Sequence, residues 1–205
     1  TPIRRQRQMC IRDSKYMKGY LGRDLSRTGW GLKFDYIIIH EAGHEWFANN
    51  ITYKDIADMW IHESFTTYSE NLYLDYHYGK EAASEYVIGT RTSISNRSPI
   101  IGKYGVNFRG SDLYSKGANI LHTLRQITRD DEKWRSILRG LNKEFYHQTV
   151  TTAQIENYIS NKMNYDLSTF FNQYLRDFRI PTLEYFYKDG NLNCRCCLLY
   201  TSDAA

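Results

Sequence analysis

The sequence contains no long apolar run, no internal repeat and no low-complexity linker. A helix that crosses a membrane needs about 18 or more consecutive, mostly apolar residues. No stretch here approaches that length, and we therefore predict no membrane span. The 205 residues, 41% hydrophobic and 24% charged, are typical of one ordinary globular domain with room for part of another.

Cysteine is also scarce, with four residues in the whole chain. Cys10 and Cys197 fall in terminal segments that are set apart below, which leaves Cys194 and Cys196. A Cys-x-Cys pair without a second pair of cysteines or histidines is a weak metal signal. We interpret both residues as structural or incidental, and they favour neither a cytoplasmic nor a periplasmic or secreted location.

The excess of positive over negative charge is small, and most of it lies in the first residues. The net charge is +4, and residues 1–14 contain four arginines and one aspartate. The segments RRQRQMCIRDS (4–14) and CLLYTSDAA (197–205) resemble translated sequencing adaptors, so we expect residues 1–14 and 197–205 to be adaptor-derived and exclude them from the fold. The rest is close to neutral, and we predict no nucleic-acid partner.

Between these segments the pattern is mainly helical. Asp58 is a suitable N-cap residue and Gly79 a suitable terminator for one helix. Thr151 and Gln154 have the spacing of a capping box. The Asp189-Gly190 pair predicts a hairpin turn after an alternating segment. The expected helices are 34–50, 58–78, 80–92, 113–128, 131–146, 152–163 and 167–176, and the expected strand is 182–188.

The segment His40-Glu41-Ala42-Gly43-His44 is an H-E-x-x-H motif inside one of these helices. Histidines at positions i and i+4 lie on one helix face, so both imidazoles can reach one ion. Glu41 projects beside them and can reach a water on the metal without ligating the metal. A catalytic zinc site needs a third protein ligand and leaves the fourth position to water.

Glu63 is the candidate for that third ligand. It lies near the start of the next predicted helix, and an antiparallel return would bring it to the histidine pair. Glu70, seven residues later, is on the same helix face and could fix the tautomer of one ligand histidine. An H-E-x-x-H motif has a chance probability of order 1% in a chain of this length. The other histidines, His62, His77, His122 and His147, have no ligand spacing.

Three ordered segments resemble one family. HEAGHEWFAN (40–49) with WIHESFTTYSE (60–70), LYSKGANILHTL (113–124) and FFNQYLRDFRIPTLE (170–184) are similar to segments of gluzincin zinc metalloaminopeptidases of the aminopeptidase N type. The resemblance implies a mainly α, thermolysin-like zincin lobe over residues 15–180. It also implies that residues 181–196 begin a β-domain and form a truncated β-hairpin.

The same resemblance implies the roles of individual residues. His40, His44 and Glu63 match the ligands of one Zn²⁺ ion, Glu41 the general base, and Tyr114 the tyrosine that stabilises the oxyanion. The implied activity is removal of N-terminal residues from peptide substrates.

Departures from the family keep other interpretations open. The usual N-E-G at the third ligand is His62-Glu63-Ser64 here, Ala48 replaces a glycine, and the G-A-M-E-N-type motif that anchors the substrate amine is missing. A zinc endopeptidase, an epoxide hydrolase of the same superfamily and a non-catalytic peptide-binding scaffold remain alternatives. We expect the 205-residue chain to bind zinc, with poor or no turnover of aminopeptidase substrates.

Overall fold

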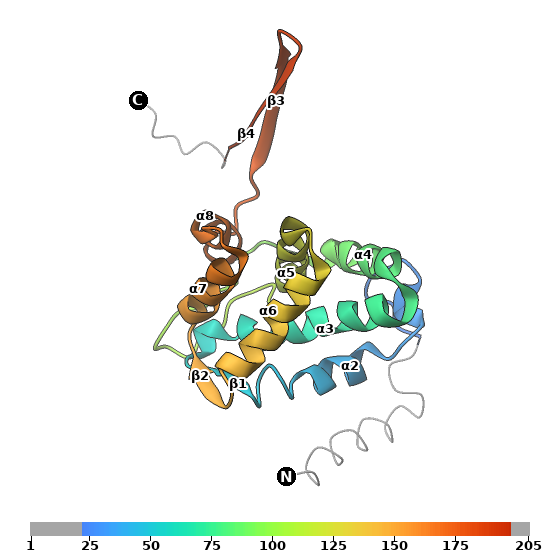
Figure 1. Ribbon diagram of the computed structural model, residues 1–205, viewed down its shortest axis with the longest axis vertical. Helices are drawn as coiled ribbons and strands as arrows, with labels where there is room; N and C mark the ends of the chain where they lie inside the picture. The colour runs from blue at the N-terminus through green and yellow to red at the C-terminus, as the bar shows by residue number, and fades with distance from the viewer. Residues whose placement is uncertain (1–21, 198–205) are drawn as a thin grey trace.

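The computed structural model describes residues 22–197, which form a helical body and one projecting hairpin (Figure 1). Both expected adaptor segments lie outside the described residues, apart from the backbone of Cys197. The mainly α fold is confirmed. The helices are α2 (Tyr36–Gly43), α3 (Trp60–Tyr78), α4 (Lys80–Gly89), α5 (Ser115–Thr128), α6 (Asp131–Glu144), α7 (Thr152–Met163) and α8 (Ser168–Phe171). Short helical segments are η1 (Trp30–Leu32), η2 (Ile56–Asp58), η3 (Thr90–Ser93) and η4 (Asn172–Arg176).

Helix α3 is the centre of the body and packs against α2, α4 and α5. Its first half is buried on almost every side, so Trp60, Phe65 and Tyr68 are at most 2% exposed. These rings join Leu121 of α5 and Trp134 of α6 in the main hydrophobic cluster. Burying one such large side chain stabilises the fold by about 1.5–3 kcal/mol. The core therefore fixes the position of α3, which carries the candidate third ligand.

All the expected helices except 152–163 differ from the observed ones at one or both ends, and two of these differences have a clear physical cause. The helix expected over 34–50 ends at Gly43, and beyond it the amides of Asn49 and Asn50 bond to carbonyls five residues back, at 3.0 and 3.1 Å. The prediction of Asp58 as an N-cap is wrong. Asp58 is fully buried in η2, where it accepts hydrogen bonds from Thr152 N at 3.2 Å and from the Tyr104 hydroxyl at 2.7 Å.

Other local predictions are confirmed. Thr151 and Gln154 form the expected capping box at the start of α7. Gly79 ends α3 with a φ of 92°, a backbone conformation that glycine adopts without a Cβ penalty. The Asp35 carboxylate, which had not been singled out, caps α2 by accepting from the amides of Ile37 and Ile38.

A small parallel pair of strands was missed. Strands β1 (Ile51–Tyr53) and β2 (Gln148–Val150) pair in register Ile51 to Gln148, and the Lys54 amide extends the ladder to the Val150 carbonyl at 2.8 Å. Each strand has three residues, too few for an alternating pattern to be recognised. The pair ties the segment after α2 to the segment before α7.

The predicted hairpin is present. Strands β3 (Thr182–Lys188) and β4 (Asn191–Cys197) pair antiparallel and stand away from the helical body (Figure 1). Asp189 and Gly190 form its turn with φ values of 51° and 75°, as a two-residue turn of this type requires. We keep as a proposal that a separate β-domain begins at residue 181.

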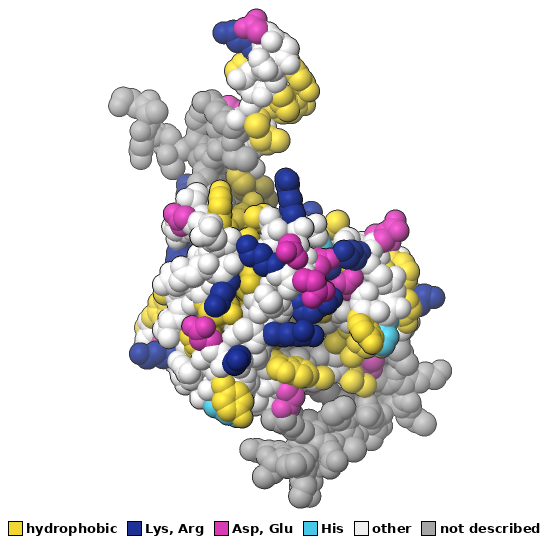
Figure 2. Space-filling view, in the orientation of Figure 1, with side chains coloured by type: hydrophobic (Ala, Val, Ile, Leu, Met, Phe, Trp, Pro, Cys, Tyr) yellow, Lys and Arg dark blue, Asp and Glu magenta, His cyan; other side chains and the backbone are white. Residues whose placement is uncertain are grey.

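Opposite charges lie side by side where α3 to α6 meet, and Figure 2 shows them interspersed on that face. Arg125 of α5 is 7% exposed and pairs with Asp75 at 2.7 Å and Asp131 at 2.8 Å. Lys80 also pairs with Asp131. These contacts join four helices, and they hold the pKa of Asp131 well below its usual range, because Arg125 and Lys80 both donate to its carboxylate.

Gly117 allows the close approach of α5 to α3. A Cβ at this position would overlap the Ser64 side chain and lie 3.2 Å from the Ser64 Cα. Ser64 is fully buried, and its hydroxyl donates to the Leu113 carbonyl at 2.6 Å. The serine that departs from the family pattern is thus satisfied by the neighbouring loop.

We predict that Gly117→Ala lowers the free energy of unfolding by about 1–3 kcal/mol, because the added methyl group overpacks the interface between α5 and α3. In a chain of this size the melting temperature should fall by roughly 2–12 °C, measured by circular dichroism. Gly43→Ala is the matched control: its Cβ would lie 3.2–3.3 Å from side-chain atoms of Ser69 and Thr66, so a small change is expected. Equal melting temperatures for both variants would contradict the prediction.

Candidate metal centre

Two turns of helix position the histidines of the H-E-x-x-H motif. His40 lies inside α2 and is 8% exposed, and His44 caps the C-terminal end of the same helix. Their ring centroids are 4.9 Å apart, with the ring planes at 83°. The expected arrangement, with both imidazoles on one face of the helix, is confirmed.

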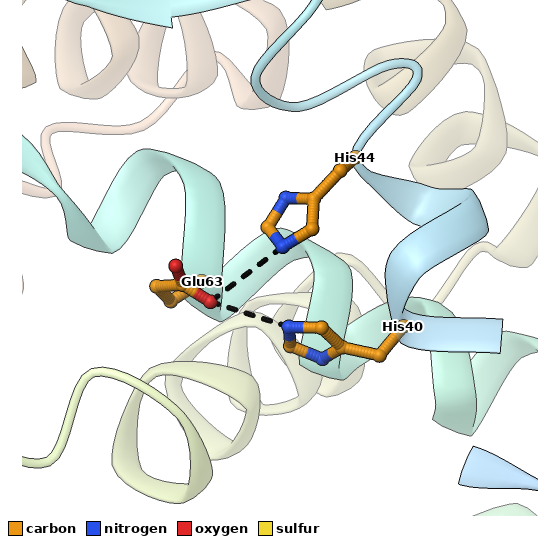
Figure 3. A group of neighbouring side chains, drawn as sticks. All are labelled: His40, His44 and Glu63. Atoms are coloured by element: carbon orange, nitrogen blue, oxygen red, sulfur yellow. Dashed lines mark hydrogen bonds and ion pairs between the residues drawn. The ribbon is translucent and has the colours of Figure 1, made fainter. Parts of the chain in front are cut away.

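Glu63 reaches the pair from the first turn of α3, as Figure 3 shows. Its Oε2 lies 3.2 Å from His40 Nε2 and 3.8 Å from His44 Nε2. One ligand atom from each of the three residues lies within 4.8 Å of the other two. Helix α3 brings Glu63 there because its start is fixed in the core, so residues 23 positions apart converge on one point.

The outer nitrogens of both imidazoles are already engaged. His44 Nδ1 lies 3.0 Å from the Phe47 carbonyl, which can only accept, so Nδ1 carries the proton. His40 Nδ1 lies 3.0 Å from Glu70 Oε1. The second nitrogen, Nε2, of each ring therefore faces Glu63. Metal-binding histidines usually have their other ring nitrogen held by an acceptor in this way, which fixes the tautomer.

The chemistry of these donors fits a zinc ion. Two imidazole nitrogens and one carboxylate oxygen are a set that catalytic zinc sites use, with a fourth position left for water. Among the described residues, His40, His44 and Glu63 are the group with metal-ligand geometry. Glu63 is 8% exposed, so water stabilises its negative charge poorly. A cation held between this carboxylate and the two imidazoles would stabilise that charge instead.

Charge coupling within the group is strong. Burial by itself lowers the pKa of His40, but hydrogen bonds to Glu63 and Glu70 outweigh it and raise the pKa to about 9. Burial by itself raises the pKa of Glu63, yet the hydrogen bond from His40 and the nearby His44 keep it below its usual value. A proton on His40 thus balances the carboxylates, and a cation bound between the rings would release that proton.

The two residues predicted to act on the substrate lie near this group. Glu41 follows His40 on α2, is partly buried, and contributes no atom to the three-residue group. Tyr114 caps α5, and its ring centroid lies 5.8 Å from that of His40. Partial burial, followed by the charge of Glu63, raises the pKa of Tyr114, so the phenol keeps its proton at neutral pH.

His62 also borders the centre, although its sequence position gives it no metal-ligand spacing. It is 9% exposed, its centroid is 6.5 Å from that of His44, and its Nε2 accepts the Tyr53 amide at 3.1 Å. Burial, and then the nearby His44, lower the pKa of His62 to about 4. It is therefore neutral and ties α3 to β1. In the sequence, only the position of His62 next to Glu63 indicates that it lies beside the centre.

The helical lobe and its His, His, Glu group define the gluzincin class of metallopeptidases. Within that class, the model of the peptidase family M1 domain matches residues 26–174. The chain belongs to peptidase family M1, and the predicted resemblance is confirmed.

Curated relatives are similar over much of this chain. Aminopeptidase N of Lactobacillus helveticus is 24% identical over 199 residues, which are 86% of this chain and 23% of that protein. Endoplasmic reticulum aminopeptidase 1 of Mus musculus is 29% identical over 138 residues, 62% of this chain and 15% of that protein. The chain thus spans less than a quarter of the length of these relatives.

Solved structures share the fold. A crystal structure of an M1 zinc metallopeptidase from Deinococcus radiodurans, bound to a Tyr-Ser-Ala substrate, superposes with a TM-score of 0.61 at 22% identity. The match covers 73% of this chain and 34% of that one.

Among the described residues, no helix is both long and apolar enough to cross a membrane.

Proposed function

We propose that this chain is the catalytic lobe of a zinc-dependent aminopeptidase, which hydrolyses the N-terminal bond of peptides. The observation that supports this most directly is the convergence of His40, His44 and Glu63 on one point, with both outer ring nitrogens held by acceptors. Membership of family M1 and the names of the relatives support the choice of zinc and of the aminopeptidase reaction.

In this proposal His40, His44 and Glu63 hold one zinc ion. When bound, zinc supplies Lewis-acid chemistry, acidifying a water molecule and polarising the substrate carbonyl. Glu41 takes the proton from that water and later passes it to the leaving amine. Tyr114 donates its phenol hydrogen to the oxygen on which negative charge develops, and thereby stabilises the transition state more than the substrate.

Two substrate sets distinguish the proposal from its alternatives. The zinc-loaded chain, in excess over substrate so that slow cleavage is detected, is incubated with aminoacyl-coumarins and with N-blocked peptides. We expect release of coumarin, loss of this release with a chelator, and no cleavage of the blocked peptides. Cleavage of blocked peptides alone would favour an endopeptidase. No cleavage of either set by a chain with zinc bound would reject peptide hydrolysis by this chain and leave the epoxide hydrolase and the non-catalytic peptide-binding scaffold.

A further inference from the structure

We infer that Tyr86 of α4 is a positioning residue of the metal centre, acting through Glu70 on His40. This inference rests on the proposed zinc site and extends it by one residue. The Tyr86 hydroxyl donates to Glu70 Oε2 at 2.6 Å, and Glu70 Oε1 lies 3.0 Å from His40 Nδ1. A continuous chain of hydrogen bonds thus connects α4 through α3 to the ligand on α2.

Burial gives this chain its strength. Tyr86 is 1% exposed and Glu70 is 2% exposed, so water does not compete for either group. Each carboxylate oxygen of Glu70 has one partner: His40 occupies Oε1 and Tyr86 occupies Oε2. Burial, and then the charge of Glu70, raise the pKa of Tyr86, so its hydroxyl remains a donor. Without that donor, Oε2 would be a buried and unsatisfied charged oxygen, which is costly.

The ring of Tyr86 is itself held in a fixed place. It packs edge-on against Phe34 with centroids 5.5 Å apart, in a small cluster that also contains Tyr36 and Leu74. Next to Glu70, the Asn71 amide donates to the Ala83 carbonyl and locks α3 to α4. The phenol oxygen is therefore fixed relative to both helices, and it restricts the rotation of the Glu70 carboxylate.

This arrangement predicts a metal phenotype for the loss of one hydroxyl. Removing a group that hydrogen-bonds directly to a ligand histidine costs about 10–100-fold in metal affinity. Tyr86 acts one bond further out, so we expect Tyr86→Phe to weaken zinc binding by about three- to tenfold. The d–d absorption spectrum of the Co²⁺-loaded chain should also shift, because the orientation of the His40 ring becomes less restricted.

The experiment compares Tyr86→Phe with Tyr158→Phe. Tyr158 is a buried tyrosine of α7 whose hydroxyl donates to the Ile137 carbonyl at 3.4 Å, outside the metal centre. Zinc affinity is measured by competition with a chromophoric chelator, and folding by circular dichroism. We expect weaker zinc binding and an altered Co²⁺ spectrum for Tyr86→Phe alone. The same affinity and spectrum in both variants would overturn the inference.

A double-mutant cycle separates positioning from a general loss of stability. In a Glu70→Ala background the Tyr86 hydroxyl has no route to His40, so adding Tyr86→Phe should not weaken zinc binding further. An undiminished effect in that background would also overturn the inference, and this comparison stays valid if the single variant is less stable. If the unmodified chain fails to bind zinc, the proposed function itself fails, which is a different result.

Discussion

A Glu63→Ala variant is expected to bind zinc more than about a hundredfold more weakly than the unmodified chain. Loss of a group that only hydrogen-bonds to a ligand reduces metal affinity by about 10–100-fold, and Glu63 is placed to ligate the ion directly. Its removal also leaves the 8% exposed His40 without one of the two carboxylates that surround it. Zinc content after dialysis and competition with a chromophoric chelator measure the effect.

The control for this variant is His77→Ala. His77 is an exposed histidine near the end of the same helix, with ring contacts to Tyr73, Tyr76 and Tyr78. Its replacement should leave zinc affinity unchanged. If Glu63→Ala kept full affinity, the third ligand would have to be sought elsewhere, and the proposed class of reaction would lose its basis.

A Glu41→Gln variant is expected to lose about 10²–10⁴-fold in the single-turnover rate constant while keeping its zinc. That range is the usual contribution of a general acid–base group, and glutamine has nearly the same shape but cannot accept the proton. Glu41 contributes no ligand atom, so the zinc affinity should not change. The measurement is coumarin release with the chain in excess, together with zinc content.

Glu45→Gln is the matched control, since Glu45 lies four residues further along and has no part in the proposed chemistry. Its rate should equal that of the unmodified chain. A Glu41→Gln variant with an unchanged rate would refute the assignment of the base, and one that lost zinc would show that the residue also supports the ion.

The sequence predicted the existence of the helices well where a helical pattern and a capping signal coincide, as at Thr151 and Gln154 of α7. The metal group could be predicted because an i, i+4 histidine pair has a fixed geometry on a helix. The existence of α2 was also predicted, but its end was not. Beyond Gly43 the chain turns so that the Phe47 carbonyl accepts from His44, a contact that no helical periodicity encodes.

Other parts of the fold and of the centre depend on tertiary contacts. Asp58 has the residue type of a cap, yet burial beside Thr152 and Tyr104 gave it a different role. His62 and Tyr86 have no spacing that relates them to the motif, and only the packing of α3 against β1 and α4 brings them near it. Glu70 was predicted because seven residues return to the same helix face.

The two buried glutamates near His40 also limit which ions suit the centre. Glu63 and Glu70, as carboxylates, together carry two negative charges in a region that water hardly reaches. A doubly charged cation with neutral imidazoles brings their sum to zero. A singly charged ion would leave one negative charge uncompensated, and a triply charged ion one positive charge, and either excess is costly at such depth. Charge balance of these two buried carboxylates thus favours a divalent ion, while the partly exposed Glu41 beside them carries a charge that water can screen.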